Sequence, residues 1–200
     1  MPRKREWYEG AIYHVTVRGN RRNDIFRDKE DFEYYLNTIE EAMVYYIQFN
    51  YKTICYCLMD NHVHLMIKTD MEPLGKLMGR ISASYTRYFN KKYNYIGHLF
   101  QDRYFSELIK SDEQMLETSR YIHLNPVRAN MVETAGVYIW SSYNMIIGNK
   151  KEKIIDSRFI LNYFKYNDGV KLYIKFVESN LMEKNYYLGF LVSEPVAKLT

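Results

Sequence analysis

The sequence is poor in cysteine and contains no long hydrophobic run. Its two cysteines, Cys55 and Cys57, lie two residues apart in a strand-like segment, a spacing that favours no disulfide framework and fits a reducing compartment. No apolar stretch reaches the roughly 18 residues that a membrane-spanning helix needs, and the first residues are charged where a secretory signal would be apolar. We therefore expect a cytoplasmic protein with no membrane partner.

Internal repeats and low-complexity segments are also absent from the sequence. The 200 residues, 47% of them hydrophobic, are enough for one sizeable core, or for one core and a small satellite. The composition therefore indicates a folded globular protein and excludes a disordered one.

Positive charge is concentrated in one part of the chain. The net charge is +4, but residues 76–110 hold seven basic and two acidic residues, so this segment is +5 and the remainder is −1. Aromatic residues alternate with the basic ones, a mixture typical of surfaces that bind phosphates and stack unpaired bases. A solvated helix face, with tyrosine as core filler in a chain of 21 tyrosines, is the alternative. Nucleic acid is favoured because four basic residues share one helical stripe: Lys76, Arg80, Arg87 and Lys91.

The hydrophobic periodicity predicts an α+β fold. Strand patterns cover residues 11–18, 51–59, 62–69 and 104–110. Helical patterns cover about 20 residues after Asp28, then residues 73–93, then a segment that a capping box opens at Ser111 and that we expect Pro126 to end. The order β-α-β-β-α-β-α is that of the ferredoxin-like, split-βαβ sheet, which is antiparallel and has two crossover helices on one face. The other face is free to hold a site.

A helical extension is expected after this core. We place the core at residues 1–135 and the extension at residues 136–200, with helical patterns at 137–147, 156–165 and 168–181.

Two histidines, His62 and His64, lie at the start of the third predicted strand. Strand alternation puts both imidazoles on one face of the sheet and Val63 on the other. Two imidazoles at this spacing are able to chelate one divalent ion. The alternative is a pair of half-buried histidines that hydrogen-bond to the backbone.

Tyr121 is the candidate nucleophile. It falls on the polar side of the third predicted helix, opposite the apolar residues, and Asn125 follows one turn later. The Asn125 carbonyl oxygen would be a third ligand that brings the phenol beside the ion. A tyrosine that is merely exposed to solvent is the alternative, and the following proline favours a non-helical Asn125.

Several separated motifs resemble one known family. They are YHVTVRGN at 13–20, LMDNHVH at 58–64, GHLFQDRY at 97–104, YIHLNPVRA at 121–129 and WSSY at 140–143. Over about residues 8–145 the sequence resembles the single-tyrosine HUH transposases, and most closely their REP-associated branch. The insertion-sequence members carry glutamine where Asn125 stands, whereas the REP-associated branch has this Asn-Pro pair.

The resemblance implies a metal-dependent endonuclease and strand transferase that acts on single-stranded DNA next to hairpins. In such an enzyme His62, His64 and Asn125 would hold Mg²⁺ or Mn²⁺, and Tyr121 would attack a DNA phosphate to form a covalent 5′-phosphotyrosine. Members of the family work as monomers or as homodimers.

Further basic residues are candidates for DNA contacts. Some face the predicted site from the first strand, some lie in the loop after it, and others lie on the basic stripe or in the third motif. They are His14, Arg18, Arg21, Arg22, Lys76, Arg80, Arg87, Lys91 and Arg103.

Two other functions are compatible with the same residues. Cys55, Cys57, His62 and His64 would make a structural zinc site, although its Cys-x-Cys spacing departs from the usual zinc knuckle. A non-catalytic protein that binds hairpin DNA or RNA is the other alternative.

Overall fold

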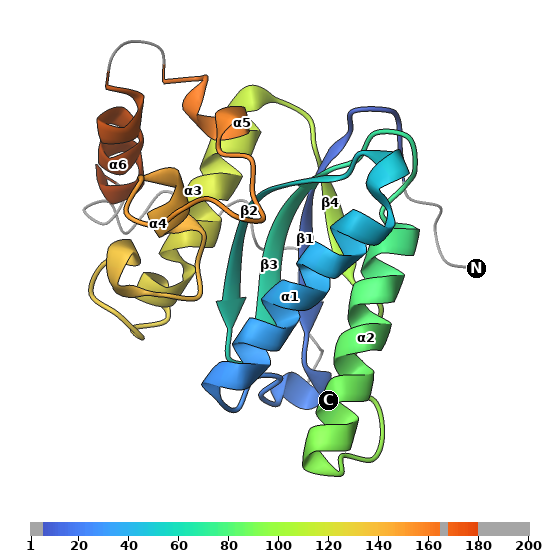
Figure 1. The fold of residues 1–200 in the computed structure, drawn as a ribbon. Coiled ribbons are helices and arrows are strands. Elements are labelled where there is room, and N and C mark those ends of the chain that lie inside the picture. The colour runs from blue at the N-terminus through green and yellow to red at the C-terminus, as the bar shows by residue number, and fades with distance from the viewer. Residues whose placement is uncertain (1–5, 165–167, 180–200) are drawn as a thin grey trace, which may run out of the picture.

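The computed structural model describes residues 6–164 and 168–179. The core elements follow one another as β1 (Ile12–Arg18), α1 (Lys29–Tyr45), β2 (Lys52–Met59), β3 (His62–Lys68), α2 (Gly75–Tyr93), β4 (Phe105–Ile109) and α3 (Asp112–Arg128), as Figure 1 shows. The predicted α+β order is therefore confirmed. None of the helices in the described ranges has the length and apolar character to cross a membrane.

The four strands form one sheet in the order β2-β3-β1-β4, and every neighbouring pair is antiparallel. Helices α1 and α2 lie side by side over one face of the sheet (Figure 1). Because successive strand residues point to opposite faces, Val15 and Val17 belong to the core, while His14 and Thr16 point to the face that α3 partly covers. The face expected to hold a site is the α3 face.

Helix α1 begins as its sequence predicts. The Asp28 side chain accepts a hydrogen bond from the Asp31 backbone N–H, and the Asp31 carboxylate accepts one from the Asp28 backbone N–H, which completes a capping box. The predicted apolar face is buried from Phe32 to Ile39, but the helix ends at Tyr45. Ile47, within the roughly 20 residues expected to be helical after Asp28, lies in a 3₁₀ turn (Ile47–Phe49) and is 75% exposed.

Helix α3 differs from the prediction at its end. The Ser111 hydroxyl accepts from the Gln114 backbone N–H, but the Gln114 side chain caps the N–H of Lys110 in place of that of Ser111. The expectation that Pro126 stops the helix is wrong, since α3 continues to Arg128. Pro126 lacks the N–H that would donate to the carbonyl four residues earlier, but the next turn still closes, through Ala129 N–H to Asn125 C=O. Asn125 therefore stays helical.

The extension forms shorter helices than predicted. They are a 3₁₀ turn (Ala135–Val137), α4 (Tyr143–Ile146), α5 (Arg158–Leu161) and α6 (Gly169–Ser179). The predictions of long helices at 137–147 and 156–165 are therefore wrong in length. Residues 165, 180 and 181 of the expected helices lie outside the described residues.

The irregular chain between these helices pairs with the outer edge of β2. The backbone N–H of Leu58 donates to Trp140 C=O at 3.0 Å, that of Ser142 to Tyr56 C=O at 3.0 Å, and that of Asp156 to Thr53 C=O at 2.9 Å. The extension thus covers an edge strand that would otherwise present unpaired donors and acceptors.

Candidate active site

Tyr121 of α3 lies over a cluster of three imidazoles on the sheet. Its ring centroid is 5.4 Å from that of His64 and 5.9 Å from that of His14. The ring of His62 is 4.8 Å from that of His64 at nearly a right angle, and His14 and His64 are stacked at 5.1 Å. The structure therefore brings together the predicted histidine pair and the predicted tyrosine.

Hydrogen bonds to Nδ1 hold the imidazoles of His62 and His64 in place. His64 Nδ1 is 2.9 Å from His14 Nε2 and 3.3 Å from the Thr16 hydroxyl, while His62 Nδ1 is 2.6 Å from the Asn61 side-chain oxygen. His64 Nε2 is buried and has no hydrogen-bond partner in the described part of the chain. A buried polar atom without a partner is costly unless something binds it, so this nitrogen is available to a ligand.

Asn125 lies at the same place, one helical turn after Tyr121. Its side chain hydrogen-bonds to His62, and its Nδ2 is a second buried atom for which the described residues supply no partner. Amide oxygen and nitrogen are assigned from such contacts, so the side chain is able to present either atom to the space beside His62.

The cluster is neutral at pH 7. Burial lowers the pKa of His14 to about 4. Burial, aided by the charge of Arg18, lowers that of His62 to about 4, although the hydrogen bond with Asn125 opposes the shift. The pKa of His64 lies well below its usual value, because of burial first and then the neighbouring positive charges of His14, His62 and Arg18. Neutral imidazoles carry the free lone pair that a metal ligand needs.

We expect the protein to lose stability as the pH falls from about 6.5 to about 4. A histidine whose pKa is lowered in the folded protein binds a proton more readily in the unfolded protein. Its contribution to the free energy of unfolding is therefore fully present above pH 6.5 and is lost as the pH falls below that value. At pH 5 each would cost about 1–2 kcal/mol. Urea unfolding at pH 7 and at pH 5 measures the loss, and replacing the buried His123, whose pKa burial lowers to about 3, by Gln should reduce it. An equal pH effect in wild type and His123→Gln would contradict this origin, and the exposed His98→Gln is the control.

His123 itself belongs to the packing and not to the site. It is buried, and its two nitrogens hydrogen-bond to the Tyr173 hydroxyl at 2.8 Å and the Ser142 hydroxyl at 3.0 Å. These bonds fasten α3 to α6 and to the segment that covers β2.

One arginine borders the tyrosine and a second lies beside the histidines. Arg18 is opposite His62 in the β1–β3 register, and the guanidinium of Arg128 lies 5.3 Å from the centre of the Tyr121 ring. Arg128 follows Tyr121 by seven residues, so the helical repeat places both on one face of α3. The site thus combines neutral imidazoles with nearby positive charge, an environment suited to an anionic ligand.

The other predicted DNA contacts are dispersed. Arg21 and Arg22 are exposed in a 3₁₀ turn (Asn20–Arg22) just beyond β1, and both adopt left-handed backbone angles. The stripe residues are exposed on α2: Lys76, Arg80, Arg87 and Lys91. Helix α2 lies on the opposite face of the sheet from α3, the helix of Tyr121 (Figure 1). Within this stripe, Lys76 pairs with Glu72 at 3.2 Å and Arg80 stacks on Tyr45 at 3.6 Å.

The cysteines do not form a metal site with the histidines. Cys57 is opposite His64 in the β2–β3 register, but in residues 6–164 and 168–179 no three His, Cys, Asp or Glu side chains are grouped to hold a metal. Burial raises the pKa of both thiols, so they are not thiolates at neutral pH. The structure therefore gives the zinc alternative no support.

The sequence missed the contact between His14 and His64. Strand alternation placed His14 on the correct face, but as a DNA contact, and the β1–β3 register that brings it to His64 has no local signal. In that register His64 is opposite Thr16, and His14 is its diagonal neighbour.

Comparisons with known proteins bear on the family and the fold of the chain. The family model described as "Transposase IS200 like" matches residues 8–125. A curated Haemophilus influenzae protein, provisionally named a REP-associated tyrosine transposase, is 24% identical over 157 residues, which cover 70% of this chain and 84% of that protein. A solved structure, described as a REP-associated tyrosine transposase bound to a REP hairpin, matches with a TM-score of 0.63 at 16% identity, covering 78% of this chain and 93% of that one. The structural match supports the shared fold.

Proposed function

The chain belongs to the family of IS200-like transposases, and from this premise we propose that it cleaves and rejoins single-stranded DNA through Tyr121. The observation that carries the proposal is the position of the Tyr121 ring, 5.4 Å from the ring of His64, whose Nε2 is buried without a partner in the described residues. A phenol beside a free ligand nitrogen is an arrangement suited to metal-assisted attack on a phosphate.

The residues present fit a divalent ion. His62 and His64 each have Nδ1 occupied by another side chain, which leaves Nε2 as the ligand atom, and Asn125 adds an amide oxygen. For His64 this requires that its Nδ1–H donates to His14 Nε2, so His14 fixes the tautomer of the ligand. Two imidazoles with oxygen ligands suit Mn²⁺ and, less well, Mg²⁺. Such an ion would polarise the phosphate oxygens and offset the repulsion between phosphodiester and phenolate.

The chain's own part in the reaction is nucleophilic attack. The Tyr121 hydroxyl loses its proton and its oxygen forms a bond to phosphorus, the bond from phosphorus to the 3′ oxygen breaks, and the leaving 3′ oxygen takes up a proton to become a hydroxyl. The charges of Arg18, opposite His62, and of Arg128, beside the Tyr121 ring, would stabilise the phosphate. The phosphotyrosine keeps the energy of the phosphoester, so a 3′-hydroxyl is able to reverse the step and join a new end.

The DNA substrate is proposed from the family and from the related proteins. A solved relative is described as bound to a REP hairpin, which supports hairpin-forming single strands as substrates of this chain. We propose further that the extension clamps α3, since His123 joins that helix to Tyr173 and Ser142. Action on such DNA would take place in the cytoplasm, by a monomer or a homodimer.

Formation of a covalent adduct tests the function. Purified protein is incubated with labelled single-stranded hairpin oligonucleotides, in Mn²⁺ or in EDTA, and separated on a denaturing gel. We expect a protein–DNA band in Mn²⁺ and its loss in EDTA, because the repulsion between phenolate and phosphate then goes unopposed. Binding of the hairpins with no adduct in either condition would favour the non-catalytic alternative, and an adduct that persists in EDTA would contradict the metal.

A further inference from the structure

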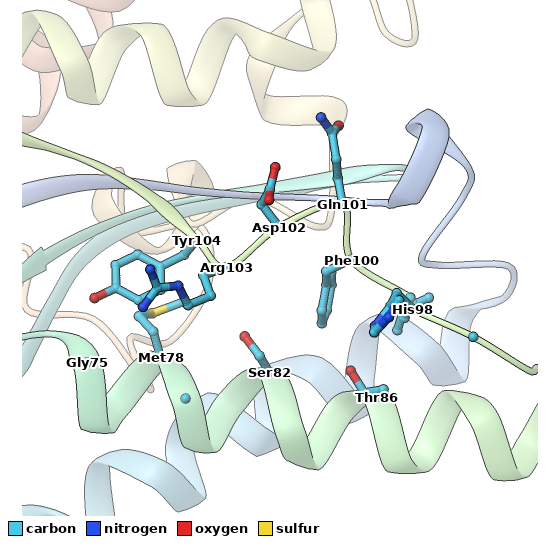
Figure 2. Close-up of a pocket in the computed structure, with 13 residues that line it drawn as sticks. Gly75, Met78, Ser82, Thr86, His98, Phe100, Gln101, Asp102, Arg103 and Tyr104 are labelled. Carbon is cyan, nitrogen blue, oxygen red and sulfur yellow. The ribbon is translucent and has the colours of Figure 1, made fainter. Parts of the chain in front are cut away.

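A groove separates α2 from the chain that leads to β4. It has a volume of about 530 Å³, within the range of roughly 300–1,000 Å³ that is usual for ligand sites. Its floor is a row of small residues on α2, and its opposite wall is the segment 97–104 (Figure 2). This groove lies on the α2 side of the sheet and shares no lining residue with the Tyr121 site.

The wall carries side chains of types that commonly contact nucleotides in other proteins. In Figure 2, Phe100 points from the segment 97–104 toward α2, while Gln101 and Asp102 point to the opposite side, and Arg103 also lines the groove. Arg103 is exposed and makes no ion pair with any described residue, so its charge is available to a phosphate or to the face of a base. An aromatic ring and a guanidinium on one wall form a stacking site for an unpaired base.

Two glycines on the floor have no role in the fold. Gly75 and Gly79 are helical, and a Cβ built on either one meets nothing within 4 Å. Glycine inside a helix is less favourable than alanine, and neither the backbone angles nor close packing requires it at these positions. Their absent side chains keep the groove open.

The groove is connected to the Tyr121 site through the backbone. The N–H of Asn20 donates to Leu99 C=O at 2.8 Å, and the N–H of Gln101 donates to Arg18 C=O at 2.9 Å. Arg18 is opposite His62 in the sheet. The same segment that forms the groove wall therefore runs beside the strand end that borders the histidines, so one DNA strand is able to reach both.

We propose that this groove binds an unpaired nucleotide of the DNA strand, with its base between Phe100 and Arg103 and above Gly79. The inference rests on the proposed function, because it assigns a second contact to the same single-stranded substrate. It makes the groove the place where the protein distinguishes a hairpin with a single-stranded extension from a bare hairpin.

Filling the groove tests the proposal. Gly79→Leu places a side chain in the open space, and Ala83→Leu adds the same side chain at an exposed α2 position outside the groove. Fluorescence anisotropy measures the Kd of the full-length variants for a DNA hairpin that is bare or carries an oligothymidylate overhang at its 5′ or 3′ end. We expect wild type and Ala83→Leu to bind one overhang form more tightly, and Gly79→Leu and Arg103→Ala to lose about tenfold for that form only.

The outcomes separate the groove from the proposed function. Gly79→Ala should melt no lower than wild type, and melting curves of Gly79→Leu show whether it remains folded. If Gly79→Leu and Arg103→Ala bind the overhang form as tightly as wild type, or lose the bare hairpin equally, the groove proposal is wrong. Wild-type adduct formation through Tyr121 would still support the proposed function in that case. A wild type that binds no hairpin and forms no adduct contradicts both.

Discussion

Tyr121→Phe is expected to lower adduct formation by at least about a thousandfold, since loss of a covalent nucleophile commonly removes that much activity. The substitution removes one oxygen and keeps the ring, which contacts His14, His64 and Arg128. The fold and the affinity for hairpin DNA should therefore stay within about twofold of wild type, because few contacts depend on the hydroxyl. Denaturing gels measure the adduct, and anisotropy measures binding by the same preparations.

A second tyrosine supplies the control for this experiment. Tyr45 is 57% exposed at the end of α1, on the other side of the sheet, so Tyr45→Phe should form adducts at the wild-type rate. Digestion of the wild-type adduct and mass spectrometry of the DNA-linked peptide should give residue 121. An adduct that survives in Tyr121→Phe would show that the nucleophile is another residue.

The parts of the site that follow a short repeat could be predicted from the sequence. His62 and His64 share a face because strand residues alternate, and Tyr121 and Asn125 share a face because a helix turns every 3.6 residues. The order of the strands and helices could be predicted from the sequence for the same reason. Both patterns depend only on near neighbours in the chain.

The parts that depend on distant pairing could not be predicted. The contact of His14 with His64 requires the β1–β3 register, which no local sequence pattern gives. The groove is lined by α2 and by an irregular segment, 97–104, which has no periodic pattern. Pro126 misled the prediction because its effect depends on where the helix ends, and tertiary contacts of α3 with the extension help to decide that.

Asp31→Ala is expected to lower the free energy of unfolding by about 3 kcal/mol, since removing one partner of a buried, hydrogen-bonded ion pair leaves the others unsatisfied. The Asp31 side chain is fully buried near the start of α1. Its carboxylate accepts from Lys92 Nζ at 2.9 Å, from the Tyr93 hydroxyl at 2.8 Å and from the Tyr88 hydroxyl at 3.0 Å, all at the end of α2. It also accepts from the Arg27 backbone N–H at 2.7 Å.

Thermal unfolding measures this loss, which for a chain of this length corresponds to a fall in Tm of about 6–12 °C. Asp31→Asn keeps the size of the side chain and loses its charge, so its Tm should lie between those of wild type and Asp31→Ala. Glu33→Ala is the matched control on the same helix, because the Lys29–Glu33 pair is exposed and such pairs contribute about 0.5 kcal/mol or less. Equal Tm values for Asp31→Ala and Glu33→Ala would contradict the role of the network.

The position of this network gives the same substitution a second expected effect. Lys92 and Tyr93 end α2, and the segment that follows them forms the groove wall and then hydrogen-bonds to Arg18 beside His62. A buried carboxylate at the start of α1 therefore fixes the point from which that segment departs. At a temperature where Asp31→Ala is still folded, its affinity for a hairpin with an overhang should fall more than its affinity for a bare hairpin. The reason is that a more mobile groove wall weakens the stacking of the unpaired base before it weakens other contacts with the DNA. Equal losses for the two DNA forms would show that the network acts on global stability alone.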